Sequence, residues 1–288
     1  MGQRETSVVR QRRLRAELRR FREEACLTQK GVAEALGWST SKMVRLENGS
    51  GNVSTSDVMA LLHYYRIDDT DIAEKLLAAT RNLEKGWWEG YRGFMTPQFL
   101  DFLGYEASAT RIRQYMGQIV PGLLQTEEYA RALLVKYAQP NEAQVDRGVR
   151  IRMRRQEILN HAAGPELLFV LDEDVIHRWV GGADLMVRQL ARLKDLARHP
   201  RISIQIVPFS KGVYVGMHGS SFTIFEFSSH DYVVALEDPD RDLILGPETS
   251  SCYLEKFLAV QQLACHDEEE VDRIIDPVID RMRLGAMV

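Results

Sequence analysis

Apolar residues recur at helical spacing through the first eighty residues of the chain. The first stripe consists of Leu14, Leu18, Phe21 and Ala25, and the positions between them are mostly arginine. This spacing predicts an amphipathic helix with a basic exterior. Four more short helices are predicted, with these inward positions: Val32, Ala33, Leu36, Met43, Leu46, Val58, Leu61, Leu62, Tyr65, Ile72, Leu76 and Leu83. The pattern therefore indicates a compact domain of five short helices.

Residues with capping preferences stand between these stripes. Thr28 and Ser39 each precede a short apolar run, as N-cap residues do, and Gly37 stands where a helix would end in a left-handed residue. Ser54 and Asp57 have the spacing of a capping box in front of the fourth helix. The second and third helices are thereby joined by a tight turn through Gly37.

The pattern changes in the second half of the chain. Helical spacing continues to about residue 161, with breaks at 120–122 and 140–141. Strand-like runs follow at 167–171, 202–206, 222–227 and 232–236, and the last two are close enough to form an antiparallel hairpin. Helices are expected at 184–199 and 249–265. The fold class predicted is an α-helical N-terminal domain followed by an α+β domain with a small, at least partly antiparallel sheet.

The segment 87–105 is unusually aromatic. It holds seven of the 24 aromatic residues, interrupted by Gly86, Gly90, Gly93 and Pro97. We interpret it as a segment that joins two domains, 1–83 and 84–288, and packs against the second of them.

Charge is distributed unevenly along the 288 residues. Residues 1–66 contain twelve Lys and Arg against seven Asp and Glu, a net charge of +5, which leaves −9 for the remainder of a chain whose total is −4. A basic N-terminal segment followed by an acidic remainder suggests that the N-terminal segment binds nucleic acid. No apolar run reaches the about 18 residues of a membrane span, and no secretory signal precedes the first helix. A soluble cytoplasmic protein is expected, with no membrane partner.

The second and third predicted helices form the motif that carries function. Residues 27–49, LTQKGVAEALGWSTSKMVRLENG, place Gln29 at the start of the first helix, Ala33 where two helices touch and Gly37 at the turn. Along its whole length this stretch resembles the helix-turn-helix of the Xre/Cro/phage-repressor family. The resemblance implies a DNA-binding domain whose second helix lies in the major groove.

The same resemblance assigns the DNA-binding residues. It implies that Thr40, Ser41 and Arg45 face the bases, that Gln29 braces them and contacts phosphate, and that Ser39, Lys42 and Asn48 hold the sugar-phosphate backbone. Arg45 suits a bidentate contact to guanine. For any one of these residues a solvated helix face is the alternative, and for the arginines of the first helix phosphate contact and solvation are equal alternatives.

The resemblance continues beyond the DNA-binding head. The segments 106–111, 120–131, 180–182, 189–190 and 205–209 are similar to a large C-terminal domain of unknown function that follows this helix-turn-helix in actinomycete-type regulators. That family is antitoxin-like and is often encoded beside a small partner protein. From the residues themselves, Thr126 is an N-cap, and Tyr129, Leu133 and Tyr137 face inward.

Three groups of side chains outside the head are candidate sites. The aromatic residues Trp87, Trp88, Tyr91 and Phe94 would suit a ligand or partner interface, with core packing as the alternative. A basic patch at 147–155 would suit DNA, an acidic ligand or a solvated surface. Asp172, Glu173 and His177 would suit a hydrolase or metal site, although carboxylates after a strand commonly cap the next helix, and no cysteine or histidine pair has zinc-ligand spacing.

The function predicted is a sequence-specific, DNA-binding transcription regulator. Its partners are a double-stranded DNA operator, a second copy of the chain, and either a small protein encoded nearby or a small-molecule ligand. No enzymatic activity, metal or cofactor is expected. The alternative is an enzyme with a DNA-targeting head, in which a hydrolase-like C-terminal domain uses Asp172, Glu173 and His177.

Overall fold

The computed structural model describes residues 5–48, 53–81, 86–137, 141–217, 219–228, 231–237, 243–245, 247–265 and 267–285. The chain divides into two compact units, one of Arg4–Ser108 and the other mainly of Ala109–Val288. Among the described residues, no helix is long and apolar enough to cross a membrane.

The N-terminal unit begins with the five helices that the apolar pattern predicts. They are α1 (Ser7–Glu24), α2 (Gln29–Ala35), α3 (Thr40–Asn48), α4 (Thr55–Tyr64) and α5 (Thr70–Thr80). Leu14, Leu18 and Phe21 enter one apolar core together with residues of α2, α3 and α4. Ala25 departs from the predicted stripe, because it is the exposed C-cap of α1. The predicted inward residue Leu83 lies outside the described residues.

This unit also contains the 3₁₀ turn η1 (Trp87–Tyr91) and helix α6 (Pro97–Ser108), which packs along α1. The backbone N of Thr6 donates to Ser108 Oγ at 2.8 Å, and Thr6 Oγ1 donates to the Gly104 carbonyl at 2.9 Å. A Cβ at Gly104 would lie 2.6 Å from Val8 Cγ2, so glycine permits this close approach. Residues 86–108 thus group with the N-terminal helices. The predicted boundary at residue 83 lies outside the described residues and stays a prediction.

The C-terminal unit is an α+β domain around one mixed sheet, in agreement with the predicted fold class. The strand order is β3-β2-β1-β4-β5-β6. The strands are β1 (Arg111–Met116), β2 (Glu166–Asp172), β3 (Ile202–Val207), β4 (Ser221–Glu226), β5 (Tyr232–Glu237) and β6 (Leu243–Ile244). β1, β2 and β3 are parallel, whereas β4, β5 and β6 continue the sheet in antiparallel fashion from β1. The predicted β4–β5 hairpin is confirmed.

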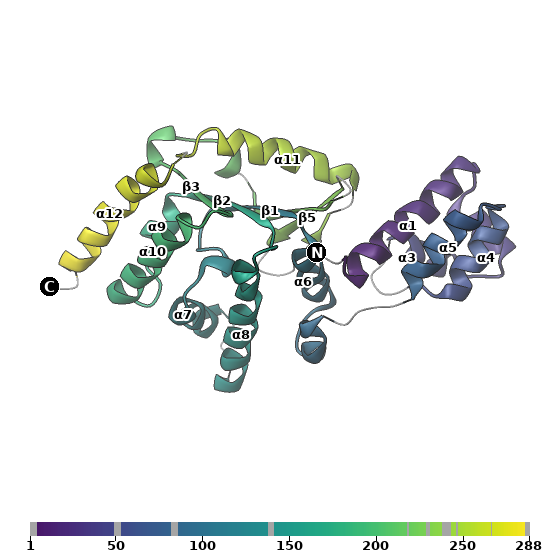
Figure 1. Ribbon diagram of the computed structural model, residues 1–288, viewed down its shortest axis with the longest axis horizontal. Coiled ribbons are helices and arrows are strands. Elements are labelled where there is room, and N and C mark those ends of the chain that lie inside the picture. Colours follow the sequence, from purple (N-terminus) through teal and green to yellow (C-terminus); the bar gives the residue numbers. More distant parts are fainter. Residues whose placement is uncertain are drawn as a thin grey trace. The chain divides into compact units, whose positions relative to one another are not determined.

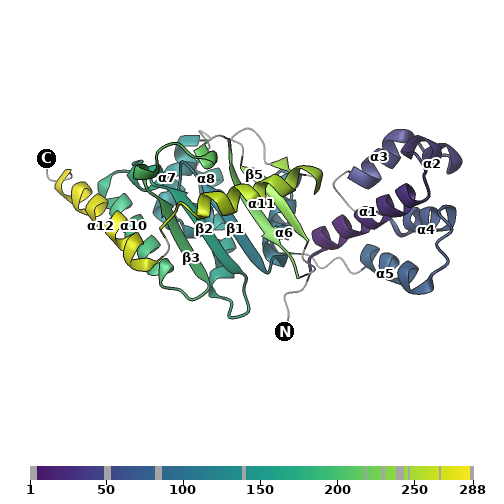
Figure 2. The ribbon, with the colours of Figure 1, turned by 90° about the horizontal axis from the view of Figure 1, so that it is seen from above.

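Helices cover both faces of this sheet. α11 (Pro247–Gln261) lies across one face, while α7 (Glu127–Tyr137), α8 (Glu142–Arg155) and α10 (Ala183–Ala197) lie on the other (Figures 1 and 2). α12 (Glu268–Gly285) packs on α10. The remaining short elements are η2 (Gly122–Leu124), η3 (Gln156–Asn160), α9 (Asp174–His177), η4 (Phe209–Lys211) and η5 (Val215–Met217). Thr126 and the inward residues Tyr129 and Leu133 lie as predicted, whereas the Tyr137 side chain lies outside the described part.

The central strand β1 corrects one prediction, because residues 111–116 were expected to be helical. Arg111 and Arg113 alternate with Ile112 and Gln114, and both arginines form ion pairs with residues of the neighbouring strands. Arg111 pairs with Glu166 of β2 at 2.6 Å and with Glu226 of β4 at 3.4 Å, and Arg113 also pairs with Glu226. Both partner strands, β2 and β4, come much later in the sequence, so the short-range pattern does not show that residues 111–116 pair with them.

Candidate nucleic-acid interface

The turn between α2 and α3 is built as the sequence predicts. Thr28 Oγ1 accepts from the backbone N of Gly31 at 3.0 Å, which caps α2. Gly37 ends this helix with φ +66°, and Ser39 Oγ accepts from the backbone N of Lys42 at 3.1 Å, which caps α3. The backbone N of Trp38 donates to the Ala33 carbonyl at 2.8 Å. These bonds fix where α3 begins relative to α2.

α3 turns one face into the core and presents the other to solvent. Met43, Leu46 and Glu47 are buried. The exposed residues of α3 are Thr40, Ser41, Val44, Arg45 and Asn48, and Ser39 just before it is also exposed. The predicted base-reading residues therefore share one accessible surface. Val44 belongs to the same surface and was absent from the predicted set, although its helical spacing from Thr40 and Ser41 indicates the position.

A buried ion pair anchors α3 to α1. The Glu47 carboxylate accepts from Arg22 Nε at 2.7 Å and from Arg22 Nη2 at 2.9 Å. Glu47 Oε2 also accepts from Gln29 Nε2 at 2.7 Å, and Arg22 Nη1 donates to the Leu27 carbonyl at 2.8 Å. The hydrogen bonds that Arg22 donates to the Glu47 carboxylate raise the pKa of Arg22. Gln29 thus braces α3 through Glu47, and its predicted phosphate contact stays a prediction.

Lys42 is already engaged by protein groups. Its Nζ lies 2.6 Å from Asp57 Oδ1 of α4 and 3.8 Å from the centre of the Trp38 ring. The predicted contact of Lys42 with phosphate stays a prediction. A phosphate oxygen would compete with Asp57 for the Lys42 ammonium.

The arginines of α1 lie beside acidic residues of the same segment. Arg13 pairs with Glu5 at 2.5 Å, Arg19 with Glu23 at 2.8 Å, and Arg20 with Glu17 at 2.7 Å. Surface pairs of this kind contribute little to stability. They do reduce the positive potential that this helix offers to DNA, so α3 remains the more direct candidate surface.

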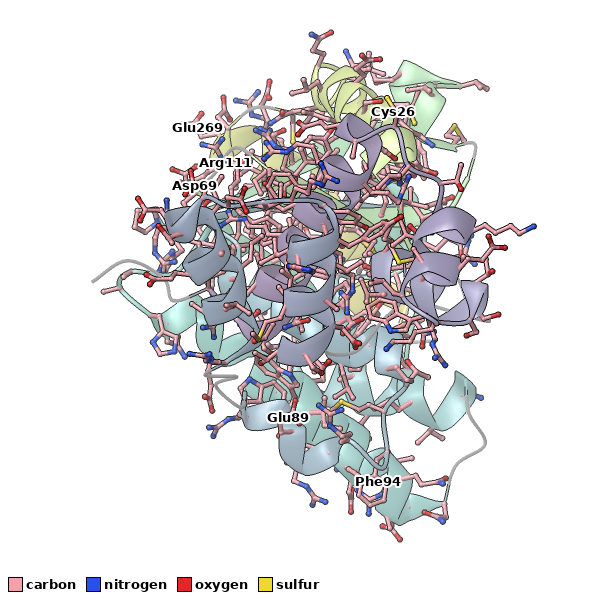
Figure 3. All side chains as sticks on the ribbon, turned by 90° about the vertical axis from the view of Figure 1, so that its right-hand side faces the viewer. Cys26, Asp69, Glu89, Phe94, Arg111 and Glu269 are labelled. Atoms are coloured by element: carbon pink, nitrogen blue, oxygen red, sulfur yellow. The ribbon has the colours of Figure 1, made fainter. Side chains whose placement is uncertain are left out.

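The aromatic residues between 87 and 94 differ in their exposure. The Trp87 ring meets Trp88 and Tyr91 edge-on, with centroids 5.7 and 6.1 Å apart. Trp88 is 6% exposed and belongs to the core, whereas Phe94 is 63% exposed and extends into solvent (Figure 3). Trp88 is therefore a core residue, and Phe94 is the more accessible candidate for an interface.

The acidic residues after β2 serve local structure. Asp172 Oδ1 accepts from the backbone N of Asp174, the first residue of α9, at 2.9 Å, and the Tyr214 hydroxyl donates to Asp172 Oδ2. Glu173 accepts from the backbone N of Phe209 at 2.6 Å and lies 3.2 Å from His177 Nε2. Both carboxylates are therefore committed to contacts that hold the loops at this end of the sheet.

The basic patch of α8 separates into two environments. Arg150 and Arg154 are exposed. Arg152 is partly buried, and its Nη1 donates to Gln125 Oε1 at 2.7 Å. Burial, with Arg155 nearby, lowers the pKa of Arg152 to about 10, and burial raises the pKa of Glu237. These arginines therefore do not form one solvated surface.

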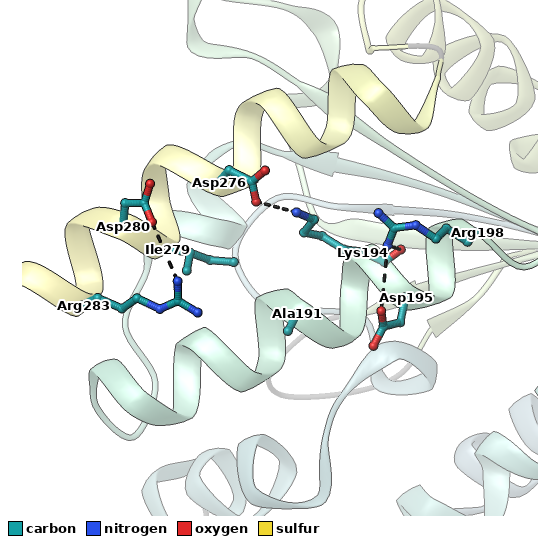
Figure 4. A pocket seen from close by; sticks show the side chains of 8 residues that line it. All are labelled: Ala191, Lys194, Asp195, Arg198, Asp276, Ile279, Asp280 and Arg283. Atoms are coloured by element: carbon teal, nitrogen blue, oxygen red, sulfur yellow. Dashed lines mark hydrogen bonds and ion pairs between the residues drawn. The ribbon is translucent and has the colours of Figure 1, made fainter.

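A hollow of about 560 Å³ lies between α10 and α12. Figure 4 shows that its charged side chains pair with one another: Lys194 with Asp276, Arg198 with Asp195 at 3.8 Å, and Arg283 with Asp280 at 3.9 Å. This arrangement is typical of a charged helix-helix contact.

Comparison with known families divides the chain at similar places. Residues 13–74 match a model described as a helix-turn-helix domain, which indicates DNA binding. Residues 99–276 match a model described as a domain of unknown function (DUF5753). No match was found among curated proteins or solved structures. Because the second match covers more than half of the chain, this protein belongs to the DUF5753 family and carries a helix-turn-helix domain at its N-terminal end.

Proposed function

We propose that this protein is a sequence-specific, DNA-binding transcription regulator of the antitoxin-like kind. The observation that carries the proposal is the accessible face of α3, where Thr40, Ser41 and Arg45 are all exposed on a helix whose other face is fixed in the core. A helix held in this way can enter the major groove and present its side chains to base edges. Arg45 is the residue best suited to discriminate guanine.

The test begins with selection of operator sequences from a random duplex library by the full chain. Arg45→Ala is expected to weaken operator binding by about 1–3 kcal/mol and to leave binding to random duplex much less affected. Arg281→Ala, which removes an exposed arginine of α12, is the matched control for charge. Equal losses on operator and random DNA, or no sequence enriched at all, would contradict the proposal.

We further propose that the chain acts without catalysis and receives its input from a small protein partner or ligand. The contacts that Asp172 and Glu173 make to backbone amides support the non-catalytic proposal. The exposed Phe94, which follows Trp87, Trp88 and Tyr91 closely in the sequence, supports an interface there, since aromatic anchors dominate binding energy at many interfaces.

This second proposal is tested by a pull-down with the full chain, followed by native mass spectrometry of the protein or small molecule that co-purifies. Phe94→Ala is expected to weaken the complex at least tenfold. Leu284→Ala, a similarly exposed apolar residue of α12, should leave the complex intact. A complex of equal strength in both variants would place the interface elsewhere.

A further inference from the structure

Val44 lies in the middle of the accessible face of α3. Thr40 and Ser41 are four and three residues before it, and Asn48 is four residues after it, so all three are its neighbours on the helix surface. The Val44 side chain is 39% exposed. It is flanked on both sides by the polar residues that the proposed function places against DNA.

A valine at this position does not serve the stability of the helix. β-Branched residues lose side-chain freedom in helices and rank below Ala, Leu, Lys and Glu there. Among the described residues of α1–α5, Val44 and Met59 are the large apolar side chains that are exposed. Met59 belongs to α4, so Val44 is the apolar group on the exposed face of α3.

The major groove offers such a side chain a specific partner. The C5-methyl group of thymine is the apolar group on the base edges there, and it makes apolar contacts with small side chains. Consecutive helix residues project about 100° apart around the helix axis. A helix that lies in the groove therefore presents Val44 and Arg45 to different base edges.

We propose that Val44 is a specificity-determining residue that recognises the methyl group of a thymine in the operator. This inference rests on the proposed function and deepens it. It identifies part of the operator, which is a thymine in each half-site whose methyl group meets Val44.

The experiment replaces each thymine of the selected operator, one at a time, by deoxyuridine, which removes the methyl group and leaves base pairing unchanged. Affinities of the full chain are measured by fluorescence anisotropy at one fixed salt concentration. At one thymine per half-site, uracil is expected to weaken binding about three- to fivefold, the effect of one buried methyl group.

The Val44→Ala variant is expected to bind the thymine and uracil forms at that position equally. Val135→Ala makes the same chemical change at an exposed position of α7 and should keep the wild-type ratio. Because Val44 is exposed and alanine favours helix, the variant is expected to fold, and circular dichroism checks this.

The possible failures are distinguishable. If no operator is enriched, the proposed function fails. If an operator is bound specifically but no thymine-to-uracil effect depends on Val44, the proposed function stands and the assignment of Val44 is wrong. If the effect disappears equally in Val135→Ala, the contact does not involve Val44 and the assignment is again overturned.

Discussion

At the scale of single residues, the Arg22–Glu47 pair holds α3 in place against α1. The Glu47 side chain has no exposed surface, and two of its hydrogen bonds come from Arg22. Removal of one member of a buried pair leaves the other charge uncompensated. We expect Glu47→Gln to lower the free energy of unfolding by about 3–5 kcal/mol, measured by urea denaturation.

The double variant Arg22→Leu with Glu47→Leu is the control for this effect. It removes both charges, so it should lose less stability than Glu47→Gln. A double variant that is less stable than the single one would show that the pair acts through packing rather than charge.

Lys42 is the second residue whose contacts lead to a prediction. Its ammonium is paired with Asp57, so a phosphate would compete with this carboxylate for it. Lys42→Ala should weaken operator and random DNA alike and reduce the slope of log affinity against log salt by about one. Asp57→Asn should strengthen binding to both DNAs, because it releases Lys42 and removes a nearby negative charge. An unchanged salt slope in Lys42→Ala would show that Lys42 makes no phosphate contact.

At the scale of elements, α6, which packs on α1, carries a carboxyl group whose titration makes the stability of the protein depend on pH. Burial raises the pKa of Asp101 on α6 from 3.8 to about 6, although Arg15 and Arg92 oppose this rise. The folded state therefore binds the proton more tightly than the unfolded state does. The contribution of Asp101 to stability is present below pH 3.8 and is lost as the pH rises through about 6.

Asp101→Asn imitates the protonated form at every pH. We expect the variant to be more stable than wild type at pH 7 and nearly equal to it at pH 4, as measured by thermal unfolding. Asp68→Asn, which removes an exposed carboxylate, is the control. A variant that loses stability at pH 7 would show that the attraction of Arg15 outweighs burial.

At the scale of the whole molecule, one helix-turn-helix contacts too little DNA for a strong operator complex. Two copies of the chain on an inverted repeat would double the contacts, with half-sites about 10 bp apart or a multiple of that. We expect footprinting with the full chain to show two symmetric protected regions, and mass photometry to show two chains per duplex. A single protected half-site with one bound chain would refute this prediction.

The sequence by itself determined the local features of the head. Caps at Thr28 and Ser39 and the left-handed turn at Gly37 involve atoms at most a few residues apart, and helical periodicity specifies which positions face inward. The residues Thr40, Ser41, Arg45 and Asn48 were named from the resemblance to the Xre/Cro/phage-repressor helix-turn-helix, and all four are exposed in the structure. Val44 could have been found by the same spacing, but its apolar side chain gave no signal for DNA.

Only the tertiary structure decided features that depend on distant partners. Residues 111–116 form a strand because β2 and β4, more than fifty positions away, pair with them on both sides, and Arg111 and Arg113 then form ion pairs with Glu166 and Glu226 there. Glu47 joined Arg22 and Gln29, and Arg152 turned to Gln125 instead of extending the basic surface of α8. Ionic and polar groups take whichever partner the fold brings within about 3 Å, and local spacing does not specify that partner.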